Sequence, residues 1–338
     1  MCLRVLLPLT FLLAPLLSTA QAVTKTREAL LFFETNNLAI SKKCLKVLSD
    51  FVIHSDPLHY QNKLESSRHE LHQQIQHFHK KELPKNEDAL KSEYSRFLND
   101  LDEFAAKLKN IAAAANPGDV LQLRQQMLRD FQYAEQAAIR LEQEVAIFCI
   151  ENRLNKPEDG SRTGKLFREA RQRLAYLIGI QELLLPVISF EQHCVNNFIP
   201  DSLCSAEKRR IEFAALVSEN NIKLKNLPAC CGDRQVKAAA LNSFRLLAIE
   251  AKNDLLHLEK FIHAEQEFVL HHQQTKGKIP ENPAEKDAYR DAVRKYNADI
   301  KAANDLVRQL EKTREEHLNA YYSAQKELME TWLTAFPE

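Results

Sequence analysis

The sequence predicts an all-α protein, and three observations favour this fold class. Only six of its 338 residues are glycine, and 27% are charged. Apolar residues recur in alternating steps of three and four, which places them on one side of an α-helix. The apolar-polar alternation of strands is absent. We therefore expect about eight long antiparallel helices in elongated helical bundles of coiled-coil type, stapled by disulfides.

The longest predicted helix runs from Pro283 to Phe336. Asn282 precedes it as a capping residue, and Glu285 supplies an acid in its first turn. At 1.5 Å per residue it would be roughly 80 Å long, so it needs long partner helices. Two polar residues, Arg314 and His317, interrupt its apolar seam. The seam consists of Tyr289, Val293, Tyr296, Ile300, Ala303, Val307, Leu310, Tyr321, Ala324 and Leu328.

The other helices follow from the same spacing and from turn residues between them. They cover residues from about Thr26 to His54, Pro57 to Leu83, Asn86 to Ile111, Asp119 to Phe148, Leu166 to Ile199, Ser205 to Asn226 and Asp233 to Gln274. The most regular seam is that of the third helix, with Leu90, Tyr94, Phe97, Leu101, Phe104, Leu108 and Ile111.

The most loop-like stretch, Asn155 to Gly164, is the expected boundary between two bundles. These are an N-terminal bundle, residues 23–155, and a C-terminal bundle, residues 156–338. A simple surface loop is the alternative interpretation of this stretch.

Residues 1–22 have the features of a secretory signal peptide. Arg4 precedes the apolar run Val5 to Leu17, which is too short to span a bilayer, and Ala20-Gln21-Ala22 supplies a small-x-small cleavage pattern. A retained membrane anchor is the alternative. With cleavage after Ala22, the mature chain would be secreted and extracellular, or periplasmic if the source is bacterial.

Neither a membrane span nor a nucleic-acid partner is expected for the mature chain. Its most apolar segment, Leu174 to Ile188, is interrupted by Gln181, Glu182 and Pro186. The chain carries 46 basic and 46 acidic residues; without Arg4 the balance is 45 − 46 = −1. Nucleic-acid binding would require a basic surface that this composition does not indicate.

Six cysteines remain after removal of the signal, and an even number in an exported protein predicts disulfides. They are Cys44, Cys149, Cys194, Cys204, Cys230 and Cys231. A bond between the neighbours Cys230 and Cys231 would close a strained ring, so each is expected to reach a different partner. The alternative is free, buried thiols that pack as small apolar groups.

Three bonds are therefore predicted. One joins Cys194 to Cys204 across the reversal at Ile199-Pro200. A second joins Cys149 to one of the vicinal cysteines, which leaves Cys44 for the other.

No catalytic residue, cofactor or metal site is predicted. The sequence lacks the GxSxG, GxxxxGK[ST] and GxGxxG patterns. The zincin pattern requires a histidine four residues after His69, and that position is Gln73. His69 and His72 have a spacing that could serve one metal ion, but no further ligands are evident.

A ligand pocket is expected where Pro186 kinks the fifth helix, because its ring opposes the carbonyl group of Glu182. A kink separates neighbouring helices locally, and Phe190 would add an apolar wall. Glu182, Pro186 and Phe190 are therefore the candidate pocket residues.

In its signal peptide, its six mature cysteines and its few glycines, the chain resembles the all-helical secreted salivary proteins of blood-feeding mosquitoes. The spacing of Cys194 and Cys204 and the Cys230-Cys231 pair are the features closest to a signature. The resemblance implies a non-enzymatic effector that binds a host protein factor and modulates haemostasis or immunity.

Two further interpretations stay open: a carrier of a small molecule or lipid with an apolar interhelical pocket, and a bacterial periplasmic adaptor or spacer. For a protein partner, the charged reversals Asn155 to Gly164 and Thr275 to Asn282 are the expected contact regions. The oligomeric state is left open by the sequence.

Overall fold

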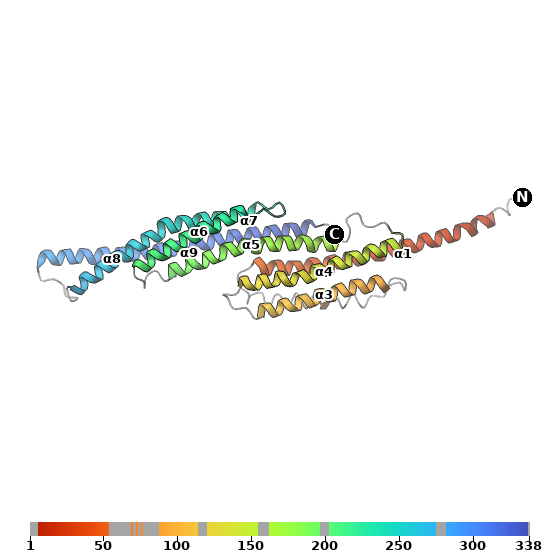
Figure 1. Ribbon diagram of the computed structural model, residues 1–338, viewed down its shortest axis with the longest axis horizontal. Coiled ribbons are helices and arrows are strands. Elements are labelled where there is room, and N and C mark those ends of the chain that lie inside the picture. The colour runs from red at the N-terminus through yellow and green to blue at the C-terminus, as the bar shows by residue number, and fades with distance from the viewer. Residues whose placement is uncertain are drawn as a thin grey trace. The chain divides into compact units, whose positions relative to one another are not determined.

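The computed structural model describes residues 6–53, 69, 72, 73, 76, 88–113, 120–154, 162–196, 203–274 and 282–336. Throughout these ranges the backbone is helical or forms a short connection between helices, and no strand occurs in them (Figure 1). The predicted all-α class is therefore confirmed.

The chain divides into two compact units. Unit 1 consists of Met1–Ile178 with Lys326–Glu338, and unit 2 of Gly179–Gln325. The divisions fall within α5 (Arg162–Asn196) and α9 (Pro283–Ala335), so each of these helices contributes to both units. Most of the stretch at which a bundle boundary was expected, residues 155–161, lies outside the described residues, and a hinge there stays a prediction.

Unit 1 is built from α1 (Leu6–Ile53), α3 (Asp88–Ala113), α4 (Val120–Glu151) and its parts of α5 and α9. Aromatic side chains form the centre of its core. The ring of Phe167 on α5 stacks on Phe131 of α4 at 5.5 Å and meets Phe97 of α3 edge-on at 5.7 Å. The described seam residues of α3 are all buried, namely Tyr94, Phe97, Leu101 and Phe104.

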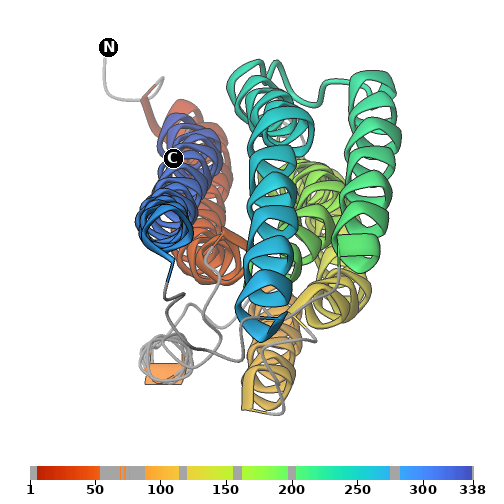
Figure 2. The ribbon, with the colours of Figure 1, turned by 90° about the vertical axis from the view of Figure 1, so that its left-hand side faces the viewer.

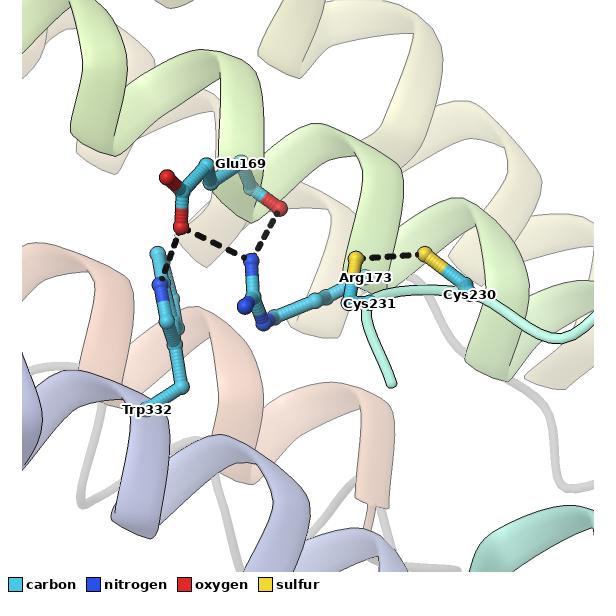
Figure 3. A network of polar contacts seen from close by, with 5 residues as sticks. All are labelled: Glu169, Arg173, Cys230, Cys231 and Trp332. Atoms are coloured by element: carbon cyan, nitrogen blue, oxygen red, sulfur yellow. Dashed lines mark hydrogen bonds and ion pairs between the residues drawn. The ribbon is translucent and has the colours of Figure 1, made fainter. Parts of the chain in front are cut away.

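The C-terminal turns of α9 are attached to unit 1 by polar contacts (Figure 3). The indole of Trp332 donates to Glu169, and the guanidinium of Arg173 donates to the same carboxylate at 3.1 Å. Lys42 Nζ donates to the carbonyl oxygen of Phe336 at 2.8 Å. These contacts place the only tryptophan of the sequence within unit 1.

Unit 2 contains α6 (Leu203–Asn226), α7 (Gln235–Ile249), the π-helical turn η3 (Glu250–Asp254) and α8 (Leu255–Gln274), with its parts of α5 and α9. The segments α7, η3 and α8 run on as one helix (Figure 2). Its predicted seam is confirmed, because every member is buried: Phe244, Leu247, Ala251, Leu255, Leu258 and Ile262.

The turn between α6 and α7 has its own polar support. Asp233 Oδ1 accepts hydrogen bonds from the backbone N–H groups of Gln235 and Val236, both at 3.0 Å. Lys237 Nζ donates to the carbonyl oxygen of Leu227, beyond the end of α6, at 2.5 Å. The positive charge of a lysine is favourable at the C-terminal end of α6, because the last carbonyl groups of a helix carry partial negative charge.

Counting α7, η3 and α8 as one helix, the described ranges hold seven long helices rather than eight. The expected second helix, Pro57 to Leu83, lies almost wholly outside them; only four of its residues are described, and these are helical. The fifth predicted helix is present as α5, which includes Pro186 within its length.

The predicted disulfide staples are wrong for the cysteines whose side chains are described, since no disulfide joins any two of them. Cys44, Cys149 and Cys194 are buried in helix seams, where thiols pack as small apolar groups. Burial raises the pKa of Cys44 to about 12 and that of Cys194 to about 11. Each thiol is buried by the helix packing of its own unit, and the sequence does not reveal that packing. The side chain of Cys204, the predicted partner of Cys194, lies outside the described side chains.

The vicinal cysteines differ from expectation in another way. Cys230 and Cys231 lie in the turn before α7, and their Sγ atoms are 2.6 Å apart (Figure 3). Cys231 has a positive φ of 57°, which turns the backbone so that the two side chains approach. The sulfurs thus contact each other instead of each reaching a distant partner.

Within the described residues, one helical segment has the length and the apolar composition needed to cross a membrane. This segment is Arg162–Val195. Of its most apolar window, 56% is buried inside the fold. A buried core helix can have the same length and apolar composition, so these two features alone do not identify a membrane-spanning helix. Side chains of residues 6–23 are not described, and the signal peptide stays a prediction.

Candidate functional site

The outer parts of α8 and α9 in unit 2 form a two-helix arm, defined as residues 263–274 and 283–302. Among its described side chains none is buried, whereas Ile262 and Ala303, which adjoin it, are. The apolar seam predicted for the last helix nevertheless continues through Tyr289, Val293 and Tyr296. Each of these three is half-buried, so the seam of the arm is covered on one side only.

Aromatic contacts hold the two helices of the arm together. Phe268 stacks on Tyr296 with ring centroids 4.4 Å apart, and the phenol of Tyr296 donates to Glu265 at 3.2 Å. Burial and the Glu265 carboxylate raise the pKa of Tyr296. Closer to the tip, His272 Nδ1 and the Tyr289 hydroxyl are 2.9 Å apart. Side-chain contacts thus join the two helices of the arm although it has no buried core.

A groove of about 400 Å³ lies along the arm. Its walls are aromatic, and alanines on both helices leave room between them. Its lining includes three acidic side chains, one lysine and one histidine. The lining residues are Ala264, Glu267, Phe268, His271, Glu285, Ala288, Tyr289, Ala292, Lys295, Tyr296 and Asp299.

A second feature of unit 2 is a buried charge cluster, made of Glu191 on α5, Glu250 on η3 and Arg314 on α9. The guanidinium of Arg314 donates to Glu191 Oε2 and forms an ion pair with it. Glu191 has no exposed surface, and Glu250 is 7% exposed. The two carboxyl groups also share a hydrogen bond.

Burial raises the pKa of Glu250 to about 9, and the negative charge of Glu191 and their hydrogen bond act in the same direction. Arg314 opposes this rise. Glu250 is therefore protonated at neutral pH, and the guanidinium of Arg314 pairs with the neighbouring Glu191.

A cavity of about 160 Å³ adjoins the cluster. Glu250, Asp254 and Arg314 contribute its charged groups, and Ser243, Gln309, Thr313 and His317 its other polar ones. The remaining walls are aliphatic: Ile188, Leu246, Leu247, Ile249, Leu306, Leu310 and Leu318.

Glu250 opens the π-helical turn η3. The apolar seam around Glu250 contains Leu247, Ala251 and Leu255, each four positions after the one before. An ideal α-helix has about 3.6 residues per turn, so two successive steps of four exceed its repeat. The wider π-turn keeps all three residues in the core, and such turns are frequent at functional sites.

The structure places the three predicted pocket residues elsewhere. Glu182 and Pro186 are exposed, and Phe190 is half-buried and stacks on Phe213 at 6.3 Å. None of the three lines the groove or the cavity described above. A pocket at Pro186 stays a prediction.

Sequence reasoning missed the charge cluster, although a signal was present. Arg314 follows the seam residue Leu310 by four, and Glu250 follows Leu247 by three. Glu191 lies four residues after the buried Val187. A charged residue at a seam position points inward, so these three positions together indicate a buried polar site.

In the part of the chain that the structure describes, no group of three or more His, Cys, Asp or Glu side chains is arranged to hold a metal ion. His69 and His72 are exposed, and each contacts the glutamine four residues further on, at 2.8 and 2.9 Å.

Comparison with other proteins adds no assignment to this geometry. The chain matches no protein-family model, no curated protein and no solved structure.

Proposed function

We propose that this protein acts by binding another protein, without catalysis, and that the groove of the arm receives an amphipathic helix of its partner. The half-covered aromatic seam of the arm carries this proposal. A stripe that is buried along one side only can bury more apolar surface when another helix covers it. Burying one large apolar side chain of the partner stabilises the complex by about 1.5–3 kcal/mol.

The arm is also suited to binding because it is ordered before the partner arrives. The Phe268–Tyr296 stack and the His272–Tyr289 contact hold the aromatic side chains in place. Side chains that are already ordered lose little conformational entropy on docking, and this favours affinity.

The charges of the groove favour a partner helix with basic residues beside its apolar face. Glu267, Glu285 and Asp299 face Lys295 and His271 there, so acidic groups are in excess. A second copy of this chain would bring the same acidic groups against one another, which is unfavourable.

The expected physiological partner follows from the resemblance to secreted salivary proteins. It is a host protein factor of haemostasis or immunity, met outside the cell. The reversal Thr275 to Asn282, expected to be a contact region, connects the two helices of the arm.

Labelled model helices test the groove. One fluorescent amphipathic peptide has leucine on one face and lysine on the other, and its counterpart carries glutamate in place of lysine. We expect the lysine peptide to bind the full chain more tightly. Ala292→Arg should weaken its binding at least tenfold, because the new side chain fills the groove and repels the peptide. Ala288→Arg, at an exposed position of the same groove, should act in the same direction.

Ala298→Arg is the matched control, since Ala298 is exposed on α9 and does not line the groove. Circular dichroism should show unchanged helicity for all three variants. Equal binding of the two peptides, or full-strength binding by both groove variants, would overturn the proposal. A dimer in sedimentation equilibrium that Ala292→Arg dissociates would instead identify a second copy as the occupant.

A further inference from the structure

The cavity beside Glu250 has in its wall a buried carboxyl group that receives no hydrogen bond from a donor outside its own carboxyl pair. Apart from the hydrogen bond that the Glu250 and Glu191 carboxyl groups share, no donor reaches the buried Glu250 Oε1, and the same holds for Glu191 Oε1. A buried polar atom without a partner is costly to the fold, and few occur in native proteins. Because Glu250 lines the cavity, a ligand placed there can supply the missing donor.

We propose that this cavity binds a small organic ammonium ion whose apolar body is about the size of one aromatic ring. The ammonium group donates hydrogen bonds to Glu250 and Asp254, and the body lies against the leucines of α7 and α9. This site is separate from the groove of the arm, and it does not depend on the protein partner proposed above.

The charges around the cavity favour a cation over an anion. The only arginine in its wall, Arg314, is already paired with Glu191. An anion would approach Glu250 and Asp254 without an unpaired cation to receive it. Charged groups in and next to the cluster are the acids Glu191, Glu212, Glu250 and Asp254 and the bases Arg209 and Arg314.

The volume of the cavity limits the size of the ligand. Its 160 Å³ is close to the roughly 150 Å³ of an engineered cavity that binds benzene in another protein. Its wall is largely aliphatic, with Leu246, Leu306 and Leu318 among the lining residues. One ring or a short alkyl chain fits, whereas a long-chain lipid does not.

Binding of a cation should also release a proton from the carboxyl group of Glu250. In the empty site Glu250 is protonated at neutral pH, and Arg314 is paired with Glu191. An ammonium ion beside Glu250 favours the ionised carboxyl group, so its proton leaves to solvent as the ligand enters. The nearby charged and titratable groups are Glu191 and Cys194 on α5, Arg209 and Glu212 on α6, Asp254 on η3, His257 on α8, and Arg314 and His317 on α9.

Calorimetry with three ring-sized probes tests this proposal on the full chain. Phenethylamine is the cationic probe, 2-phenylethanol the neutral one and 3-phenylpropionate the anionic one. We expect phenethylamine to bind at least tenfold more tightly than either of the others. In buffers of different ionisation enthalpy near pH 7, its binding should release about one proton.

Glu250→Gln keeps the shape of the side chain and resembles the protonated carboxyl group, so the fold should be retained. This substitution should abolish the proton release and lower the affinity for phenethylamine to the affinity for 2-phenylethanol. Leu246→Trp should fill the cavity and block both probes. Glu207→Gln, at an exposed position of α6, is the control and should change neither affinity nor proton release.

Failure to bind any probe would mean that the cavity holds water only, and would overturn the proposal. Tightest binding of the anionic probe, or full-strength phenethylamine binding by both Glu250→Gln and Leu246→Trp, would overturn it as well. Peptide binding by the arm is measured separately, so each proposal can fail without the other.

Discussion

The indole Nε1 of Trp332 donates a hydrogen bond of 2.7 Å to the carboxylate of Glu169, 163 residues away in the sequence. The guanidinium carbon of Arg173 lies 4.4 Å from the centre of the indole ring. Trp332 is 8% exposed, so its N–H group has little access to water. This contact joins α9 to α5 within unit 1.

Glu169→Ala should destabilise unit 1 by about 1–2 kcal/mol, because it leaves the buried indole donor of Trp332 unsatisfied. Trp332 is the only tryptophan, so its fluorescence during urea unfolding reports on this unit. Glu330→Ala is a suitable comparison: this exposed carboxylate on α9 only pairs with Lys326 at 3.9 Å, and the change should cost less than about 0.5 kcal/mol. Equal effects of the two substitutions would contradict the importance of the Trp332 contact.

The buried Glu250 should make stability depend on pH. Folding raises its pKa from an ordinary value near 4.5 to about 9. Between these values the folded chain holds a proton that the unfolded chain releases, so the free energy of unfolding falls as pH rises. The slope approaches at most about 1.4 kcal/mol per pH unit.

Thermal melts followed by circular dichroism between about pH 5.5 and 8.5 measure this dependence. Glu250→Gln cannot lose a proton, and its melting temperature should fall less steeply over the same range. Glu207→Gln should follow the original protein. Parallel curves for all three proteins would rule out a buried, protonated Glu250.

The cysteines should separate into two classes by reactivity. Cys44, Cys149 and Cys194 are buried, and the pKa values of Cys44 and Cys194 are raised, so almost no thiolate is exposed to reagent. Cys231 is exposed and Cys230 half-buried. Brief treatment of the native protein with iodoacetamide should label Cys230 and Cys231 first.

Peptide mapping by mass spectrometry checks this order, and all five should be labelled at similar rates in denaturant. A native disulfide at Cys44 or Cys149, found by mapping without reduction, would restore the predicted staples. Such a result would contradict the burial of these thiols as separate side chains.

The arm should open more easily than the helix from which it extends. No described side chain from 263 to 273 is buried, whereas Leu255, Leu258 and Ile262 are. Amide hydrogen exchange in the arm should therefore be faster than in residues 236–262. Phe268→Ala should speed it further by about tenfold, equivalent to 1.4 kcal/mol, by removing the stack on Tyr296.

The global melting temperature should hardly change in Phe268→Ala, because the arm makes little contribution to the core. Val269→Ala, at an exposed position next to it, serves as the control and should leave exchange unchanged. Slow, uniform exchange along α8 would contradict a separately opening arm.

Much of the helical fold could be predicted because helix signals are local. A three-four repeat specifies which residues lie on one side of a helix, and Tyr94, Phe97 and Leu101 are buried as expected. The capping signal at Asn282 likewise marks the start of α9, where its side chain accepts a bond from the Ala284 N–H at 3.1 Å.

The candidate sites could be predicted only in part. The seam of the arm was visible in Tyr289, Val293 and Tyr296, but its incomplete coverage depends on how many helices lie beside it. Arg314 interrupts the apolar spacing of the last helix in the sequence, whereas in the structure it enters the core to meet Glu191.

The sequence by itself determined the helical class, the approximate helix limits and the inward side of each helix, because these depend on neighbours within a turn or two. Only the tertiary structure decided which inward residues meet. It brought Glu250 of η3 to Glu191 of α5, and within unit 1 it buried Cys44 and Cys149 without a disulfide between them. Both outcomes depend on the distance between side chains on different helices, which spacing along a single helix does not encode.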